Sequence, residues 1–143
     1  MLVDANILLY AVDTESRFHS AASAWLTDAL NGPRRIGLPW QSTTAFLRIA
    51  TNPRAARNPL SPREAWEIVD AWLTAPAAWI PMPGPGYVTI FSDLIVRYDP
   101  HAGLISDAAI AALAIEHGVE VVSADSDFAR FSEIRWVNPL ACT

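Results

Sequence analysis

Short apolar segments alternate with longer amphipathic segments along the whole chain, and this alternation restricts the fold more than any other feature. The segments that we interpret as strands lie at 1–3, 36–38, 79–82, 119–122 and 134–137. The segments between them have helical periodicity. Because strands that alternate with helices form parallel pairs, the sequence predicts an α/β fold, with a central parallel sheet of four to five strands flanked by helices.

The predicted helices span residues 5–12, 21–30, 40–50, 62–73, 84–98 and 107–117, and a further helical turn lies at 128–131. The helix at 62–73 has the strongest signal, since Ser61 and Glu64 form a capping box around Pro62. Ser106 is expected to cap the helix that begins at Asp107.

The length and composition favour one folding unit. The chain has 143 residues, of which 52% are hydrophobic, and six are tryptophans. This is enough apolar material to fill one core. We expect a single domain over residues 1–140 and a short C-terminal tail over 141–143.

The charge and the reactive side chains exclude several classes of protein. The net charge is −5, so a basic coat for nucleic acid is excluded and any contact with RNA must be local. All ten basic residues are arginines, which excludes every mechanism that needs a lysine amine. The single cysteine, Cys142, excludes a disulfide framework. No run approaches 18 apolar residues, so we expect a cytoplasmic protein without a membrane span.

Aspartates follow two of the predicted strands. Asp4 comes directly after the first strand, and Asp125 and Asp127 come after the strand at 119–122. The carboxyl ends of parallel strands meet at one edge of a sheet, where α/β proteins bind their ligands. We therefore expect these side chains to lie near one another.

Asp107 is harder to place, because it opens the helix that leads into the strand at 119–122. We expect such a helix to begin at the opposite edge of the sheet. Asp107 then joins the other aspartates only if its first turn crosses near their edge, or if the helix enters from a long connection at 99–105.

A group of three or four carboxylates without clustered histidine or cysteine is the ligand pattern that suits Mg²⁺ or Mn²⁺. Such a metal activates water and stabilises charge on a phosphoryl oxygen. Each aspartate alone is better explained as a helix cap or a turn residue than as a metal ligand, and only the combination favours a metal site.

The combination resembles the PIN-domain ribonucleases, and especially the VapC toxins of bacterial VapBC toxin–antitoxin pairs. The resemblance rests on the segments 2–9, 107–114 and 122–128, and it continues through 46–54 and 136–140. It implies a PIN-like three-layer sandwich and a Mg²⁺- or Mn²⁺-dependent endoribonuclease that acts as a toxin. The implied partners are RNA, a cognate VapB-type antitoxin and a second copy of the chain.

The resemblance also assigns roles to the aspartates. Asp4, Asp107 and Asp125 are the implied metal ligands, and Asp127 is an additional catalytic carboxylate. The family fold places the start of the Asp107 helix beside the metal site, which removes the difficulty with its position.

One feature departs from the family pattern. PIN nucleases usually have a glutamate early in the helix that corresponds to 40–50, but residues 41–46 contain no acid. Thr44 is the closest equivalent, and Ala45 is the next. A threonine hydroxyl holds a metal-bound water without adding charge, so the site binds metal more weakly or Asp127 compensates.

Arg48, Arg54 and Arg57 form the densest basic stretch of the chain. Beside an acidic cleft they are candidates to hold RNA phosphates, although arginines on a loop and a helix flank are often only solvated.

Two other functions remain open. The missing glutamate is compatible with a catalytically weak or inactive PIN-like module that binds RNA or protein. A receiver-like phosphoacceptor domain also gathers aspartates at strand ends, but it relies on a lysine that this chain lacks.

Overall fold

The computed structural model describes residues 1–141 and contains a five-stranded parallel sheet. In chain order its strands are β1 (Leu2–Val3), β2 (Ile36–Gly37), β3 (Ala78–Trp79), β4 (Val121–Val122) and β5 (Trp136–Val137). In space they lie in the order β3-β2-β1-β4-β5, so the first strand of the chain is the central one. β1 pairs in parallel with β2 on one side and with β4 on the other. The predicted parallel sheet is confirmed.

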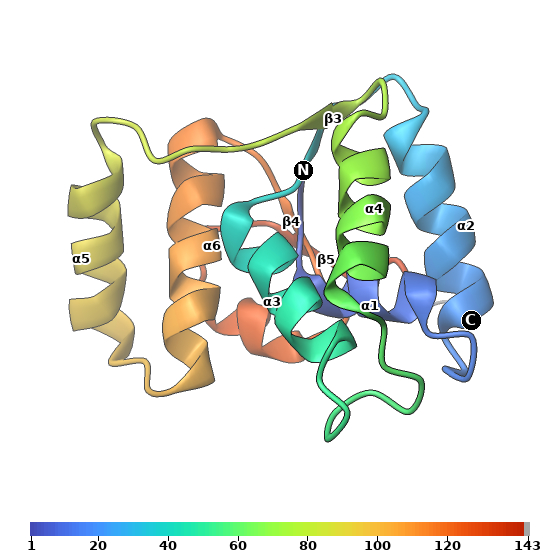
Figure 1. Cartoon of the computed structure of the whole chain (residues 1–143). Helices are drawn as coiled ribbons and strands as arrows, with labels where there is room; N and C mark the ends of the chain where they lie inside the picture. The colour runs from blue at the N-terminus through green and yellow to red at the C-terminus, as the bar shows by residue number, and fades with distance from the viewer. Residues whose placement is uncertain (142–143) are drawn as a thin grey trace.

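Two layers of helices enclose this sheet. The helices are α1 (Ala5–Val12), α2 (His19–Leu30), α3 (Trp40–Ala50), α4 (Pro62–Leu73), α5 (Tyr87–Tyr98), α6 (Gly103–His117) and the short 3-10 helix η1 (Ser126–Arg130). In Figure 1 the sheet lies in the middle, with α5 and α6 on one side and α2 and α4 on the other. The expected three-layer sandwich is therefore confirmed.

The central strands supply side chains to both hydrophobic cores. Leu2 and Val121 belong to the core on the side of α5 and α6, whereas Val3 and Val122 belong to the core on the side of α1 to α4. Successive residues of a strand point to opposite faces of the sheet, which explains this division. All four side chains are at most 1% exposed. The sheet is covered on both faces, as parallel sheets generally are.

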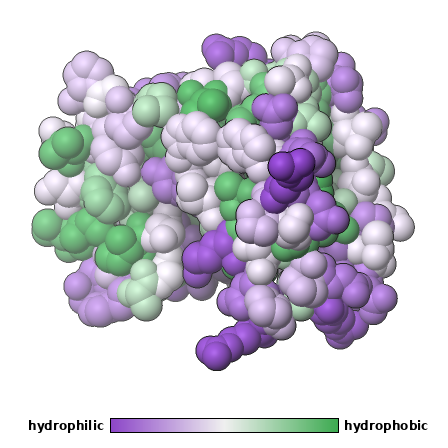
Figure 2. Space-filling view, in the orientation of Figure 1, coloured by the Kyte–Doolittle hydropathy of each residue, from purple (hydrophilic) through white to green (hydrophobic). Residues whose placement is uncertain are grey.

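α6 is buried on most of its circumference because it lies between the sheet and α5. Its buried residues are Ala108, Ile110, Ala111, Ala112, Leu113 and Ala114. A helix that is apolar on most sides is typical of such a position, and the alanines allow close packing. α5 is instead peripheral and has an apolar outer surface, where Val88 and Val96 are 75% and 81% exposed. Figure 2 shows apolar side chains gathered over this part of the molecule.

The start of α6 differs from the prediction. The helix begins at Gly103, four residues before Asp107, so Ser106 lies inside the first turn and does not cap it. The chain enters α6 through a tight turn, in which the Leu104 N–H donates to the His101 carbonyl at 3.1 Å. This turn places Ala102 at φ 52° and ψ −122°. No pattern in the sequence predicts this conformation of Ala102.

Other boundaries also differ, and two of them flank one connection. β3 ends at Trp79, earlier than the predicted 79–82, and α5 begins at Tyr87, three residues later than predicted. The connection between them contains Pro81, Pro83 and Pro85, which have no N–H group for a ladder or a helix. Glu116 of α6 holds this connection, since its carboxylate accepts from the Gly84 and Gly86 N–H groups at 2.6 and 2.8 Å. Of the expected tail, Ala141 lies in a turn, and residues 142 and 143 are outside the described residues.

Candidate active site

A cleft of about 680 Å³ lies at the carboxyl edge of the central strand. Three parts of the chain line it. They are the β1–α1 junction, α3 and the first two turns of α6, which contribute Asp4, Ala5, Gln41, Thr44, Ala45, Arg48, Gly103, Ser106, Asp107 and Ile110. Two of the four predicted aspartates, Asp4 and Asp107, therefore line the cleft.

The other two aspartates lie beside Asp107. One carboxylate oxygen from each of Asp107, Asp125 and Asp127 lies within 4.8 Å of the other two. This spacing allows one cation to contact all three side chains. The described residues thus bring together every aspartate that the sequence singles out, with Asp4 coupled electrostatically to both Asp107 and Asp125.

The placement of Asp107 corrects our expectation about its helix. A helix that leads into a parallel strand runs antiparallel to that strand, so it begins at the carboxyl edge and ends at the amino edge. α6 follows this rule, and its first two turns lie against the cleft. The expectation of the opposite edge was wrong, and no unusual crossing of α6 is needed.

Asp4 is held by a network that joins the ends of β1 and β4. One carboxylate oxygen accepts from the Ala5 N–H at 2.7 Å. The other accepts from Asn6 Nδ2 at 2.9 Å and from Ser123 Oγ at 2.7 Å. Asn6 Oδ1 in turn accepts from the Ala124 N–H at 3.1 Å. These bonds fix the orientation of the Asp4 carboxylate. Metal-binding carboxylates are typically oriented by such hydrogen bonds.

Asp125 and Asp127 are ordered by the start of η1. The Asp125 side chain accepts from the Asp127 N–H at 2.8 Å, which closes a turn typical of aspartate. The Asp125 N–H donates to Ser123 Oγ at 3.0 Å, so this serine orients two of the aspartates. Arg130 of η1 contacts Asp127 through an ion pair of 3.2 Å.

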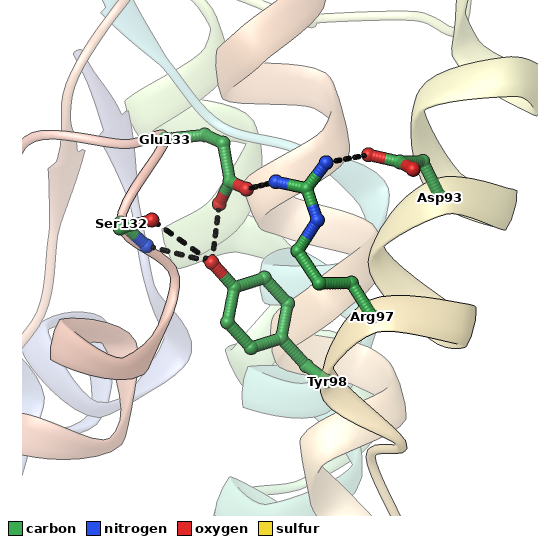
Figure 3. Close-up of polar contacts among 5 residues, drawn as sticks. All are labelled: Asp93, Arg97, Tyr98, Ser132 and Glu133. Carbon is green, nitrogen blue, oxygen red and sulfur yellow. Dashed lines mark hydrogen bonds and ion pairs between the residues drawn. The ribbon is translucent and has the colours of Figure 1, made fainter.

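Contacts with α5 hold the chain directly after η1 (Figure 3). The Tyr98 hydroxyl accepts from the Ser132 N–H at 3.1 Å and donates to the Glu133 carboxylate at 2.8 Å. Arg97 pairs with the same glutamate and with Asp93, the latter at 2.8 Å. The Tyr98 ring packs edge-on against buried Phe131. η1 is thus anchored just beyond its C-terminal end.

The carboxylates disfavour one another's charge. Burial raises the pKa of Asp4 above its ordinary value, the charge of Asp125 adds to this increase, and hydrogen bonds from Ser123 and Ala5 oppose it. Burial is also the largest cause for Asp107, and together with the charges of Asp4, Asp125 and Asp127 it raises the pKa of that carboxyl to about 7.

A bound cation would reverse these shifts, because it stabilises the ionised carboxylates. The available donors are carboxylate and hydroxyl oxygens, which are the ligands of hard cations such as Mg²⁺ and Mn²⁺. The residues present therefore fit a divalent metal ion.

α3 lines the cleft without an acidic side chain. Thr44 lies where we expect the equivalent of the family glutamate, and Ala45 is beside it in the cleft. The Thr44 hydroxyl donates to the Trp40 carbonyl within the helix, and the residue is exposed. Its oxygen accepts additional hydrogen bonds, so Thr44 is able to hold a water molecule but adds no negative charge.

The three arginines that the sequence analysis names do not form one surface. Arg48 lines the acidic cleft. Arg57 instead borders a separate cavity near Phe46 and pairs with Glu15 at 3.6 Å. Arg54 is exposed on the loop after α3. Arg48 is thus the one of the three that borders the cleft.

Asn6 and Ser123 are functional candidates that sequence reasoning missed. Both lie next to strand ends, but their importance depends on the contact between β1 and β4, which neighbouring sequence does not reveal. Arg130 was missed as well. Its spacing of three residues from Asp127 within a helical turn was a usable signal.

Over the described residues, the helices include none with the length and apolarity needed to cross a membrane.

Comparisons with known proteins agree with the fold. Residues 1–134 match the PIN domain. The chain is 43% identical to Ribonuclease VapC37 of Mycobacterium tuberculosis over 142 residues, which cover 98% of this chain and 97% of that protein. It is 39% identical to Ribonuclease VapC33 of the same species over 140 residues, or 98% of each chain.

Solved structures with low sequence identity share the architecture. VapBC2 from Rickettsia felis, bound to a promoter DNA fragment, has a TM-score of 0.69 at 14% identity and 96% coverage of both chains. VapC20 of Mycobacterium tuberculosis, a toxin that cleaves the sarcin-ricin loop, has a TM-score of 0.67 at 15% identity, with coverage of 94% of this chain and 98% of the other. The chain therefore belongs to the PIN-domain family, and the relatives that it matches over nearly its whole length are VapC ribonucleases.

Proposed function

We propose that this protein is a metal-dependent endoribonuclease that hydrolyses RNA phosphodiester bonds and acts as the toxin of a type II toxin–antitoxin pair. The observation that carries the proposal is that Asp4 and Asp107 line one cleft, with Asp125 and Asp127 beside Asp107, in a chain whose relatives are ribonucleases. The unit that acts is residues 1–140, and its site of action is the cytoplasm, where its RNA substrate is found.

Asp4, Asp107 and Asp125 would hold Mg²⁺ or Mn²⁺, and Asp127, with a carboxylate oxygen within 4.8 Å of those of Asp107 and Asp125, would be an additional ligand. When bound, the metal would supply an activated water and neutralise charge on the phosphate. Ser123 and Asn6 keep the Asp4 carboxylate directed at the site. Arg48 borders the cleft, and its guanidinium offers a fork of donors to the RNA backbone.

The direct test is cleavage of structured RNA by the purified protein with Mg²⁺ or Mn²⁺. Asp4→Asn keeps the size of the side chain but removes its charge, so we expect at least a hundredfold loss of cleavage, and chelation of the metal to abolish it. Asp28→Asn is the matched control, since Asp28 is an exposed residue of α2. Undiminished cleavage by the Asp4 variant would contradict the proposal.

A catalytically weak or inactive RNA-binding module is the second candidate, because α3 contributes no acid to the cleft. Calorimetry with Mn²⁺ separates the two functions. A nuclease binds the ion at or below millimolar concentration, whereas a module that lost its chemistry shows no binding heat. The receiver-like function has no further support, since the chain belongs to the PIN-domain family and contains no lysine.

We further propose that the protein binds a VapB-type antitoxin and forms a homodimer. VapBC2 and VapBC-1 of Haemophilus influenzae are solved structures of toxin–antitoxin complexes with this fold. Coexpression with the product of the adjacent gene would give a stable complex that no longer cleaves RNA. Sedimentation of the protein alone would give twice the mass of one chain.

A further inference from the structure

Arg130 contacts the acidic site from η1. Its Nη2 atom lies 3.2 Å from an Asp127 carboxylate oxygen, and its Nε–H donates to the Asp127 main-chain carbonyl at 3.2 Å. The carboxylate that it holds belongs to the group of three whose oxygens lie within 4.8 Å of one another. Of the ten arginines in the chain, Arg130 is the one whose charge acts on Asp107.

This ion pair is easily broken. The Arg130 side chain is 39% exposed and that of Asp127 is 49% exposed. Exposed pairs contribute little to stability, because water competes for both partners. A divalent cation that binds Asp107, Asp125 and Asp127 would compete with Arg130 for the Asp127 carboxylate. It would also repel the guanidinium beside it.

A released guanidinium remains next to the cleft, since the Arg130 main chain belongs to η1. This helix is anchored beyond its end by the contact of Tyr98 with Ser132. Guanidinium groups bind phosphate oxygens through two parallel hydrogen bonds. The RNA phosphates closest to the metal are the anions that it would meet there.

We propose that Arg130 is a substrate-binding residue that exchanges partners: it pairs with Asp127 in the metal-free site, and it binds an RNA phosphate once a metal ion has taken that carboxylate. The inference rests on the proposed ribonuclease function. It links the two binding events, because metal loading frees the group that then recognises the RNA backbone.

The two roles that Arg130 could have make opposite predictions for metal affinity. If it only braces η1, its loss loosens Asp127 and weakens metal binding. If it competes with the metal, its loss strengthens metal binding. Calorimetric titration with Mn²⁺ in the absence of RNA therefore distinguishes them without any measurement of activity.

For Arg130→Gln we expect Mn²⁺ to bind about three- to fivefold more tightly than to the wild type, in line with the loss of an exposed competing charge. We expect KM for RNA to rise about tenfold at saturating metal, while kcat changes less than threefold. Arg130→Lys keeps the charge but not the fork of donors, so its Mn²⁺ affinity should match the wild type and its KM should be intermediate.

Arg135→Gln is the matched control. It removes the same charge from the amino edge of the sheet, where Arg135 pairs with Glu120 at 3.3 Å, and neither quantity should change more than twofold. If the wild type binds Mn²⁺ and cleaves RNA, but Arg130→Gln has unchanged or weaker Mn²⁺ affinity or an unchanged KM, the exchange does not occur. If the wild type neither binds the metal nor cleaves RNA, the proposed function fails and this inference fails with it.

Discussion

The environment of Asp107 disfavours the ionised form of its carboxyl group. It is half-buried at the start of α6, and four neighbouring charges act on it, three of them negative. Arg130 is the single positive one and only partly offsets them. A carboxyl group in this setting costs stability when it ionises without a counter-ion, and such a cost is typical of functional sites.

The pH dependence of stability should reflect this cost. The pKa of Asp107 rises from 3.8 to about 7 on folding, so between these values the folded protein binds more protons than the unfolded chain. The free energy of unfolding therefore falls as pH rises through this window. We expect Asp107→Asn to raise Tm at pH 8 with chelator present, and to raise it clearly less at pH 5, where only part of this window has been crossed.

The comparison needs thermal unfolding of both proteins at both pH values, with Asp28→Asn as a control whose effect does not depend on pH. Mn²⁺ at pH 8 should raise Tm of the wild type more than that of the Asp107 variant. If Asp107→Asn changed Tm equally at pH 5 and at pH 8 in the absence of metal, ionisation of Asp107 would carry no cost in stability.

Ala102 has a backbone conformation that is unfavourable for alanine. Its φ of 52° and ψ of −122° fit the first central position of a type II′ turn, which favours glycine. An alanine in this conformation is strained by about 1 kcal/mol or more. Ala102→Gly should therefore stabilise the protein by about 1 kcal/mol in urea unfolding. The same change at Ala109, inside α6, should destabilise it by about 0.5–1 kcal/mol.

At the scale of elements, η1 depends on α5 for its anchorage. Tyr98, the last residue of α5, contacts both Ser132 and Glu133, and its ring packs on Phe131. Asp125 and Asp127 lie at the opposite end of η1. A helix that is remote from the cleft thus supports the segment that carries two of its carboxylates.

Removal of the Tyr98 hydroxyl tests this support. Tyr98→Phe keeps the ring packing but leaves the Ser132 N–H and Glu133 without this partner, so we expect a loss of about 1–2 kcal/mol in the free energy of unfolding. We also expect weaker Mn²⁺ binding by calorimetry. Tyr87→Phe, on the first turn of α5, is the matched control. A stability loss with unchanged Mn²⁺ affinity would mean that the anchor does not reach the site.

The elements also show what the sequence could and could not reveal. The bounds of α1, α3 and α4 agree with the prediction, because apolar periodicity and the capping box of Ser61 and Glu64 are local signals. The start of α6 was missed, since the strained turn at Ala102 has no sequence signature. Asp4, Asp125 and Asp127 were found from strand ends and Asp107 from the family resemblance, but the positions of Asn6, Ser123 and Arg130 relative to them depend on tertiary contacts.

At the scale of the whole molecule, the charge restricts how RNA is held. The net charge is −5, yet the substrate we propose is a polyanion. Arg48 and Arg130 are the basic residues with contacts that place them at the cleft among residues 1–141. RNA binding should then use few phosphate contacts and depend on the metal.

The salt dependence of binding measures this number. With two or three phosphates neutralised, the slope of log K against log salt should be about −1.4 to −2.1 for a single strand. Fluorescence anisotropy with the Asp4→Asn variant and Mg²⁺ avoids cleavage during the measurement. A slope steeper than about −4 would require a broad basic surface that we do not find in the described residues.

The central position of β1 affects when the active site forms during synthesis. Asp4 leaves the ribosome well before β4, but β1 completes its pairing only with that strand, at Val121 and Val122. The carboxylates whose charges act together with that of Asp4, those of Asp107, Asp125 and Asp127, come from residues 107–127. A nascent chain therefore carries no assembled nuclease centre until the segment with β4, Asp125 and Asp127 has emerged, and before that point the ribosome that makes the toxin is not exposed to its activity.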